Sequence, residues 1–177
     1  MKYIFETERL RVREFNTGHT AFIIELLNTP GWLEFIGDRN VRTEEQARSY
    51  LENGPMKSYR ENGFGLYMVE TKQTNIPVGM CGILKRDTLD HPDIGFAFLP
   101  QHAGLGYAKE IAKATLNYAD SALNMARLLA ITKPNNRRSI RLLESIGFTY
   151  SGTFQTKDET DHLLLYQVDF DGNAANL

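Results

Sequence analysis

The sequence predicts a mixed α/β (α+β) domain built around one central sheet, and two observations predict it. Helical and strand periodicities follow one another in the order strand, two helices, three strands, helix, strand, helix, two strands. The 177 residues are 42% hydrophobic and 24% charged, which suits a globular fold with a single core. We therefore expect one domain over residues 1–170, followed by a polar tail over residues 171–177.

The first predicted strand lies within residues 7–15, where apolar and charged residues alternate. Leu10 and Val12 point to one face of this strand, and Arg11 and Arg13 point to the other. A period of two with one apolar face is typical of a strand that is buried on one side. The opening strand is therefore expected to lie against the core through its leucine and valine.

Two helices are predicted next. Residues 17–28 have apolar positions at helical spacing, and Thr17 is a candidate cap for that helix. The second helix follows Thr43, because Gln46 stands three residues later and completes the spacing of a capping box. Pro55 marks its end, since proline cannot continue a helix through its interior.

An antiparallel meander is predicted in the middle of the chain. Apolar runs over residues 64–70, 76–86 and 93–100 are separated by short polar links. Cys81, the single cysteine, lies in the second run among apolar residues. We expect it to be a small buried hydrophobic residue and not a nucleophile, and one cysteine excludes an internal disulfide.

The last third supplies two helices and three strands. A helix follows residue 106, and a strand occupies residues 127–134. The next helix, over residues 135–148, has its stop at Gly147, because glycine tolerates the backbone conformation that ends a helix. Two more apolar runs then give the final strand pair.

The segment QHAGLG (residues 101–106) places glycines immediately before a helix. A helix N-terminus offers unpaired N–H groups and a partial positive charge, so it binds anions such as phosphate, and glycines let the anion approach. The segment is neither of the common phosphate loops. Tyr107 and Ala108 replace the Lys and Ser/Thr of a P-loop, and Lys109 stands where a Rossmann fingerprint needs its third glycine.

The pattern Q-x-x-G-x-G over residues 101–106 resembles the acyl-CoA loop of the GNAT acetyltransferase superfamily. Residues 6–15, 93–100 and 136–148 are similar to the opening strand, the fourth strand and the last helix of the branch that includes ribosomal-protein alanine N-acetyltransferases. The resemblance covers about residues 6–154, with the motifs in the expected order. It implies a mostly antiparallel sheet of about seven strands with about four helices, splayed between the fourth and fifth strands.

The resemblance implies an enzyme that moves an acetyl group from acetyl-CoA to a primary amine by direct attack on the thioester. Phe98 and Leu99 occupy the place where the fourth strand pairs with the pantetheine arm, and the Phe98 amide is the candidate for stabilising the oxyanion. Gln101 opens the loop motif, and Asn136 matches the cofactor-contacting asparagine, although it also suits a helix cap. The amides expected on the diphosphate are those of Ala103, Gly104, Leu105, Gly106, Tyr107 and Ala108.

The resemblance does not by itself identify which residues donate and accept protons. Leu143 stands where many members have a tyrosine that protonates the leaving thiolate. Ser139 is then the candidate that contacts the cofactor and donates to sulfur, and a bond to the helix backbone is its alternative role. Asp93 is the candidate for taking a proton from the amine or orienting it, and a turn role is its alternative.

The acceptor amine is expected to contact Trp32, Phe35 and Asp38, which follow the first helix. Core packing is the alternative for the two aromatic residues. Residues 156–162 also carry acidic side chains that attract a cationic substrate or form a solvated hairpin tip. These acidic residues are Asp158, Glu159 and Asp161.

Composition limits the other functions. The net charge of −2 gives no attraction to nucleic acid or a membrane surface, and no signal-peptide or membrane-spanning run is present, so we expect a cytoplasmic enzyme without a metal. Acetyl-CoA and an amine are the expected partners, with a protein N-terminus as one candidate for the amine, and the oligomeric state, monomer or homodimer, stays open. Two alternatives remain: a noncatalytic acyl-CoA-binding module, and a detoxifying acyltransferase for small molecules such as polyamines or aminoglycosides.

Overall fold

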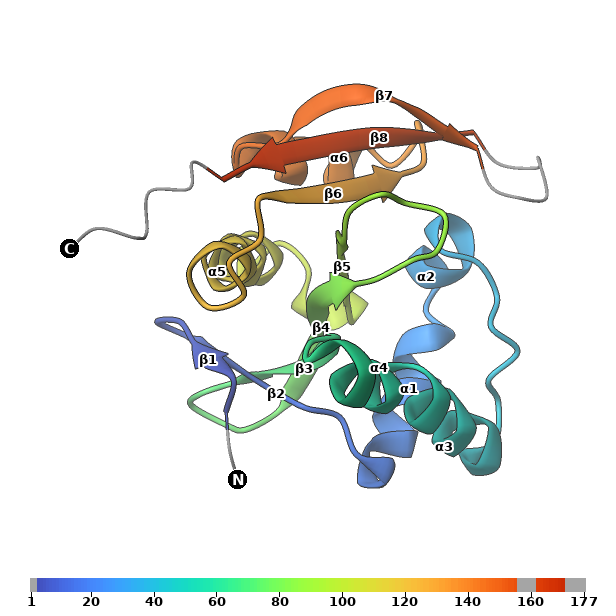
Figure 1. Ribbon diagram of the computed structural model, residues 1–177. Helices are drawn as coiled ribbons and strands as arrows, with labels where there is room; N and C mark the ends of the chain where they lie inside the picture. Colours follow the sequence, from blue (N-terminus) through green and yellow to red (C-terminus); the bar gives the residue numbers. More distant parts are fainter. Residues whose placement is uncertain (1–2, 156–161, 171–177) are drawn as a thin grey trace.

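The computed structural model describes residues 3–155 and 162–170, which form an eight-stranded sheet in the order β1-β2-β3-β4-β5-β6-β8-β7 (Figure 1). Neighbouring strands are antiparallel, except that β5 and β6 are parallel. The predicted tail over residues 171–177 lies outside the described residues. The strands are β1 (Phe5–Glu6), β2 (Leu10–Arg13), β3 (Leu66–Thr71), β4 (Pro77–Leu84), β5 (Asp93–Phe98), β6 (Arg127–Thr132), β7 (Thr149–Gln155) and β8 (His162–Asp169).

Helices cover the sheet on both faces (Figure 1). One buried cluster joins α5 and α6 to the strands, and another joins α1, α2 and α3 to alternate residues of β3 and β4. This alternation follows from the period of two in a strand. The helices are α1 (Thr20–Leu27), α2 (Pro30–Phe35), α3 (Glu44–Asn53), α4 (Pro55–Asn62), α5 (Tyr107–Ser121) and α6 (Arg137–Ser145), with 3₁₀ turns η1 (Thr17–His19) and η2 (Pro100–His102).

The predicted fold class is confirmed, and three short elements come in addition. The two residues of β1 pair with β2, a segment too short to show a period in the sequence. Both α2 and α4 begin at a proline, Pro30 and Pro55. Pro55 was expected only as the end of a helix, but proline also fits the first turn of a helix, where no N–H is required.

The predicted helix ends are mostly confirmed. The Thr43 hydroxyl accepts the N–H of Gln46 in a complete capping box. Gly147, with φ of +106°, follows the end of α6. Thr17 is not a cap: the Asn16 side chain accepts the N–H of Gly18 in that place, because the chain first forms a 3₁₀ turn.

The expected splay is present between β5 and β6. These two strands share one register pair, Asp93 opposite Leu129, and the Leu129 N–H donates to the Pro92 carbonyl at 2.9 Å. Beyond that pair the strands are not paired with each other, so the sheet opens in its middle. This opening is what positions the candidate site.

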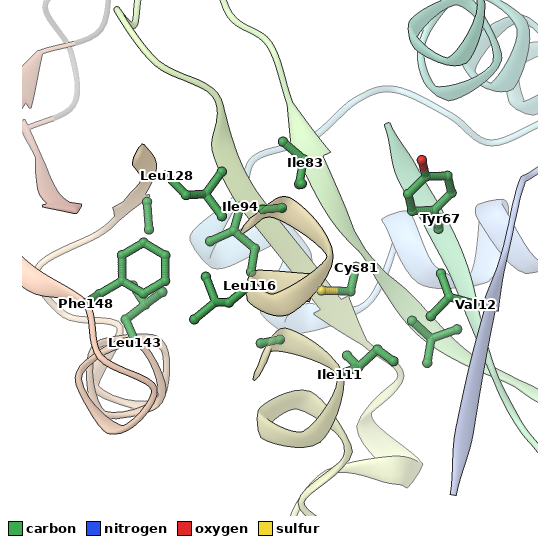
Figure 2. Packing of buried hydrophobic residues seen from close by; sticks show 14 of the residues in the cluster. Val12, Tyr67, Cys81, Ile83, Ile94, Ile111, Leu116, Leu128, Leu143 and Phe148 are labelled. Atoms are coloured by element: carbon green, nitrogen blue, oxygen red, sulfur yellow. The ribbon is translucent and has the colours of Figure 1, made fainter. Parts of the chain in front are cut away.

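Cys81 lies in the core, as predicted, among residues that include Ile83 and Ile111 (Figure 2). It is fully buried, and burial raises the pKa of its thiol to about 12. A thiol in this state is not a nucleophile at neutral pH. In the described part of the chain, no helix has the length and apolar character that crossing a membrane requires.

Candidate active site

A cavity of about 1120 Å³ lies where β5 and β6 separate. Its wall combines β5, the glycine loop and the start of α5 with the end of β6, α6 and α2. The structure thus brings together residues that are more than 100 positions apart in sequence. The predicted site residues that line the cavity are Trp32, Phe35, Asp93, Phe98, Ala103, Gly104, Gly106, Tyr107, Ala108, Asn136 and Ser139.

The glycine loop ends in an uncapped helix N-terminus. Gly104 and Gly106 both have φ of +80°, a conformation that glycine adopts without strain. Gly106 is the N-cap of α5, and no described side chain caps the N–H groups of the first turn. In the described ranges, no atom beyond Gly104 and its two chain neighbours lies within 4 Å of the point where a Cβ of Gly104 would stand. These free amides and the helix dipole form a suitable cradle for a phosphate group.

The inner edge of β5 presents backbone groups to the cavity. The Leu99 N–H donates to the Val78 carbonyl of β4 at 2.9 Å. Successive N–H groups of a strand point to opposite edges, so the Phe98 N–H points toward the gap and β6. Gly79 on β4 leaves room for the Phe98 side chain, because a Cβ at residue 79 would lie 2.6 Å from the Phe98 ring.

Three predicted cofactor residues have side chains directed elsewhere. Leu99 is 3% exposed and packs in the cluster beneath α1 and α3. The Gln101 amide donates to Glu25 of α1 at 3.0 Å, which fixes the loop to that helix. The Leu105 side chain is exposed, and its carbonyl accepts from Arg9.

Ser139 lies in the first turn of α6 and lines the cavity. Its backbone N–H donates to the Asn136 side chain at 3.1 Å, so Asn136 is a helix cap as well as a cavity residue. The Ser139 hydroxyl has no hydrogen-bond partner within residues 3–155 and 162–170. It is therefore available to a bound molecule.

Leu143, one turn further along α6, is 1% exposed and packs beside Phe148 (Figure 2). An aliphatic side chain in this place cannot donate a proton. Two serines of α6, Ser139 and Ser145, line the cavity, but the Ser145 hydroxyl donates to the Leu142 carbonyl at 2.8 Å. Ser139 is therefore the α6 serine whose hydroxyl has no partner among the described residues.

Asp93 is 1% exposed, and both of its carboxylate oxygens accept from Nε of Arg86, at 2.9 and 3.0 Å. Burial raises the pKa of Asp93 above its usual range, although the charge of Arg86 opposes this change. A carboxyl with a raised pKa accepts a proton more readily near neutral pH. Arg86 at the same time holds the carboxylate in one orientation.

The α2 side of the cavity has an aromatic wall. Trp32 is 6% exposed and packs in the core, and it also lines the cavity. Phe35 lines the cavity beside it. Asp38 does not line the cavity: its carboxylate accepts from Arg42 at 2.7 Å, and this hydrogen bond lowers the pKa of Asp38. The predicted carboxylates of residues 156–161 lie outside the described residues.

Several cationic side chains of the cavity wall did not appear among the sequence-based candidates. Arg86 follows β4 in a charged link, and only its pairing with Asp93 reveals its importance. Periodicity carries no signal for such residues, because exposed arginines are ordinary on helices and links. The other cationic residues of this wall are Arg39, Lys109, Arg138 and Arg141. Within the described ranges, no three His, Cys, Asp or Glu side chains are grouped as metal ligands.

The comparisons with known proteins agree with this geometry. The family model described as "Acetyltransferase (GNAT) domain" matches residues 9–149. An uncharacterized protein of Bacillus subtilis (strain 168), YkkB, is 30% identical over 152 residues, which cover 84% of this chain and 87% of YkkB. A spermidine N(1)-acetyltransferase of Vibrio cholerae is 25% identical over 151 residues, 81% of each chain.

A solved structure shows the same fold. It is the ribosomal-protein-S5-alanine acetyltransferase from Vibrio fischeri, with a TM-score of 0.79 and 19% identity over 94% of this chain and 96% of that one. The splayed sheet, the uncapped glycine loop and the family match converge on one conclusion. The chain belongs to the GNAT family of N-acetyltransferases, whose acyl donor is acetyl-CoA.

Proposed function

We propose that the protein transfers the acetyl group of acetyl-CoA directly to a primary amine that is not a polycation. The observation that carries the proposal is the cavity between β5 and β6, which joins a phosphate cradle to an unpaired strand edge and an aromatic wall. A linear cofactor with a diphosphate at one end and a thioester at the other fits this sequence of environments. The amine then approaches from the α2 side.

The acyl donor is held by backbone groups in this proposal. The diphosphate lies on the amides at residues 103–108, and the pantetheine amides pair with the inner edge of β5 as an added strand. The Phe98 N–H, which points into the gap, donates to the thioester oxygen. That hydrogen bond strengthens as the oxygen becomes negative in the tetrahedral intermediate.

Two side chains handle the protons. Ser139 donates its hydroxyl hydrogen toward the leaving sulfur, which is supported by the absence of any other partner for that hydroxyl within the described residues. Asp93 stands at the other end of β5 from Phe98, about 16 Å away along the strand, so it draws the proton of the amine away through a chain of waters, with Arg86 fixing the carboxylate. Thiolate is a good leaving group near neutral pH, so a weak donor such as serine is sufficient.

The charges of the cavity wall favour an acceptor with few positive charges. In the described part of the wall, Asp93 is the one carboxylate, and Arg86 already neutralises it. Arg39 adds a further positive charge on the α2 side and forms no ion pair with a described residue. A polyamine would be repelled there, whereas a protein N-terminus or a small monoamine carries one ammonium group.

The test is release of free thiol from acetyl-CoA with a panel of amines. The panel contains short peptides with a free N-terminal alanine or serine, a simple monoamine, spermidine and an aminoglycoside, and a reaction without amine gives the hydrolysis background. We expect kcat/KM to be at least about tenfold higher for a singly charged amine than for spermidine. Ser139→Ala should lower kcat with little change in CoA affinity.

The other outcomes each contradict a defined part of the proposal. Faster turnover of spermidine or the aminoglycoside would make the protein a polycation acetyltransferase. No thiol release with any amine, together with tight CoA binding, would make it an acyl-CoA-binding module. An unchanged kcat in Ser139→Ala would remove that serine from the catalytic residues.

A further inference from the structure

Arg9 connects the start of β2 to the glycine loop and to α5. Its Nη1 donates to the Leu105 carbonyl at 2.9 Å, and its Nε donates to the Glu110 carboxylate at 2.7 Å. Its Nη2 lies 2.7 Å from the same carboxylate oxygen, and the guanidinium sits 4.8 Å from the centre of the Tyr107 ring. One side chain thus contacts three successive parts of the loop and helix start.

Glu110 keeps Arg9 in place through further bonds. The second carboxylate oxygen of Glu110 accepts from the Thr7 hydroxyl at 2.6 Å and from the Arg9 backbone N–H at 3.0 Å. Burial alone would raise the pKa of Glu110, but these hydrogen bonds and the charge of Arg9 hold it below its usual range. Glu110 is therefore ionised at neutral pH, and Arg9 keeps its Nη1 for the loop.

The bond to Leu105 determines how the next amide is oriented. The peptide between Leu105 and Gly106 is planar and trans, so its carbonyl and its N–H point in opposite directions. Because the Leu105 carbonyl points to Arg9, the Gly106 N–H points away from Arg9. Gly106 lines the cavity, whereas Arg9 does not. Arg9 thus acts on the cavity through the loop backbone.

The loop needs such a restraint because of its composition. A glycine on each side of Leu105 has many accessible conformations, and ordering them costs conformational entropy. Gly106 also leaves the space in which Arg9 lies, since a Cβ there would stand 3.3 Å from Nη2 of Arg9. A charge-assisted bond from a rigid, fork-shaped guanidinium fixes the peptide plane before the ligand arrives.

We propose that Arg9 is a positioning residue for the diphosphate of acetyl-CoA: by holding the Leu105 carbonyl, it aims the glycine-loop amides into the cavity. The proposal rests on the proposed function, which places the diphosphate on that loop. Its effect is specific to the donor's diphosphate, because the β5 edge and Ser139 lie on other elements.

The experiment compares two acyl donors in Arg9→Gln. One donor is acetyl-CoA, and the other is S-acetyl-N-acetylcysteamine, a thioester that ends before the diphosphate. We expect kcat/KM for acetyl-CoA to fall about tenfold to hundredfold, the effect of one charge-assisted hydrogen bond, with kcat at saturation nearly unchanged. The kcat/KM for the short donor should change by less than about twofold. The kcat/KM of Arg9→Lys for acetyl-CoA should lie between those of the wild type and Arg9→Gln, since lysine carries a single ammonium donor in place of the forked guanidinium.

Controls separate this role from a structural one. Arg48→Gln breaks an exposed ion pair with Glu44 on α3 and should leave both donors unaffected. Glu110→Gln should change the donor ratio in the same direction as Arg9→Gln. The ratio of the kcat/KM values for the two donors, measured in one preparation, does not depend on how much of the protein is folded.

Equal losses for both donors, or no loss for acetyl-CoA, would overturn the role of Arg9. If the wild-type protein releases no thiol from either donor, the proposed acetyl transfer fails instead. Calorimetric affinities for CoA and pantetheine then decide the matter for Arg9: a loss confined to CoA in Arg9→Gln supports the positioning role, and an equal or absent loss refutes it.

Discussion

Gly104 has the two properties that the phosphate cradle needs, a backbone conformation suited to glycine and no side chain in the way. Its φ of +80° favours glycine, and open space surrounds the position of a side chain. A Gly104→Glu variant should therefore fold, at a cost of about 1–2 kcal/mol from the left-handed backbone. It should weaken CoA binding by at least about a hundredfold, because a carboxylate would stand beside the diphosphate. Calorimetric titration with CoA measures this loss.

Gly104→Ala is the matched control for that variant. Alanine imposes a similar backbone cost but introduces no charge and little bulk. CoA affinity in Gly104→Ala should lie much closer to wild type than in Gly104→Glu. Equal affinities in all three proteins would show that the diphosphate lies elsewhere.

The sequence predicted the residues that offer backbone groups to the site better than the side-chain ion pairs around it. The glycines were indicated by their place just before a helix, and Asn136 and Ser139 by the resemblance to the acetyltransferase family; all of them line the cavity. The pairing of Arg9 with Glu110 and of Arg86 with Asp93 was not predicted. The first pair is 101 residues apart, and a carboxylate in the first turn of a helix is already accounted for by the helix dipole.

The β2–β3 pair contains a buried charge cluster that should make the fold sensitive to acid. Glu70 is 2% exposed and accepts from Nε of Arg11 and Nε of Arg13, each at 2.9 Å. Burial alone would raise the pKa of Glu70, but the hydrogen bonds from the two arginines hold it below its usual range. The folded state therefore binds this proton less readily than the unfolded state, and the stability from Glu70 is lost as the pH falls.

We expect Glu70→Gln to lower the free energy of unfolding by about 3 kcal/mol at pH 7, because two partly buried arginines lose their buried counter-ion. The difference from wild type should shrink below about pH 4, where the carboxylate of the wild type becomes protonated. Urea unfolding at several pH values measures both effects. Glu44→Gln, in an exposed pair on α3, is the control and should change stability by less than about 0.5 kcal/mol at any pH. A constant difference between wild type and Glu70→Gln down to pH 2 would contradict the assigned ionisation.

Element boundaries were predictable where a side chain caps the backbone, as Thr43 does at α3. They were less predictable where a residue suits two places. Pro30 and Pro55 fit the end of one element and the first turn of the next, and tertiary packing of Trp32 and Met56 determines which applies. Local propensity cannot distinguish these cases, because the deciding contacts come from distant segments.

The whole molecule consists of two part-sheets that meet at one register pair, Asp93 and Leu129. A ligand that lies between β5 and β6 contacts both parts, so CoA should stabilise the entire fold. At a concentration of 100 times its Kd, CoA should raise the free energy of unfolding by about 2.7 kcal/mol, or the Tm by about 5–10 °C. Thermal unfolding with increasing CoA measures this shift. The same CoA concentrations should give a smaller shift in Gly104→Glu, and equal shifts would place CoA outside the gap.

The architecture was predictable from the order of the motifs, since each occupies a definite place around the opening of the sheet. The proposed acceptor side was predictable only in part, because Trp32 and Phe35 line the cavity whereas Asp38 does not. The wall on this side contains residues of α2 and Arg39 from the segment after it. The α2 helix was not predicted, because it begins at a proline. No short sequence motif describes a pocket that is assembled from such distant segments. The net charge of its wall also depends on the ion pair between Asp93 and Arg86, which only the structure shows.

The inner edge of β5 has a practical consequence. A strand edge on a protein surface invites other chains to add to it, whereas this edge is enclosed by the walls of the cavity, including α2 and α6. Any slender molecule with amide groups at strand spacing can occupy it without a nucleotide. A short peptidomimetic that places an aromatic group against Trp32 is therefore a rational starting point for inhibitors, and it avoids the highly charged half of the donor that hinders entry into cells.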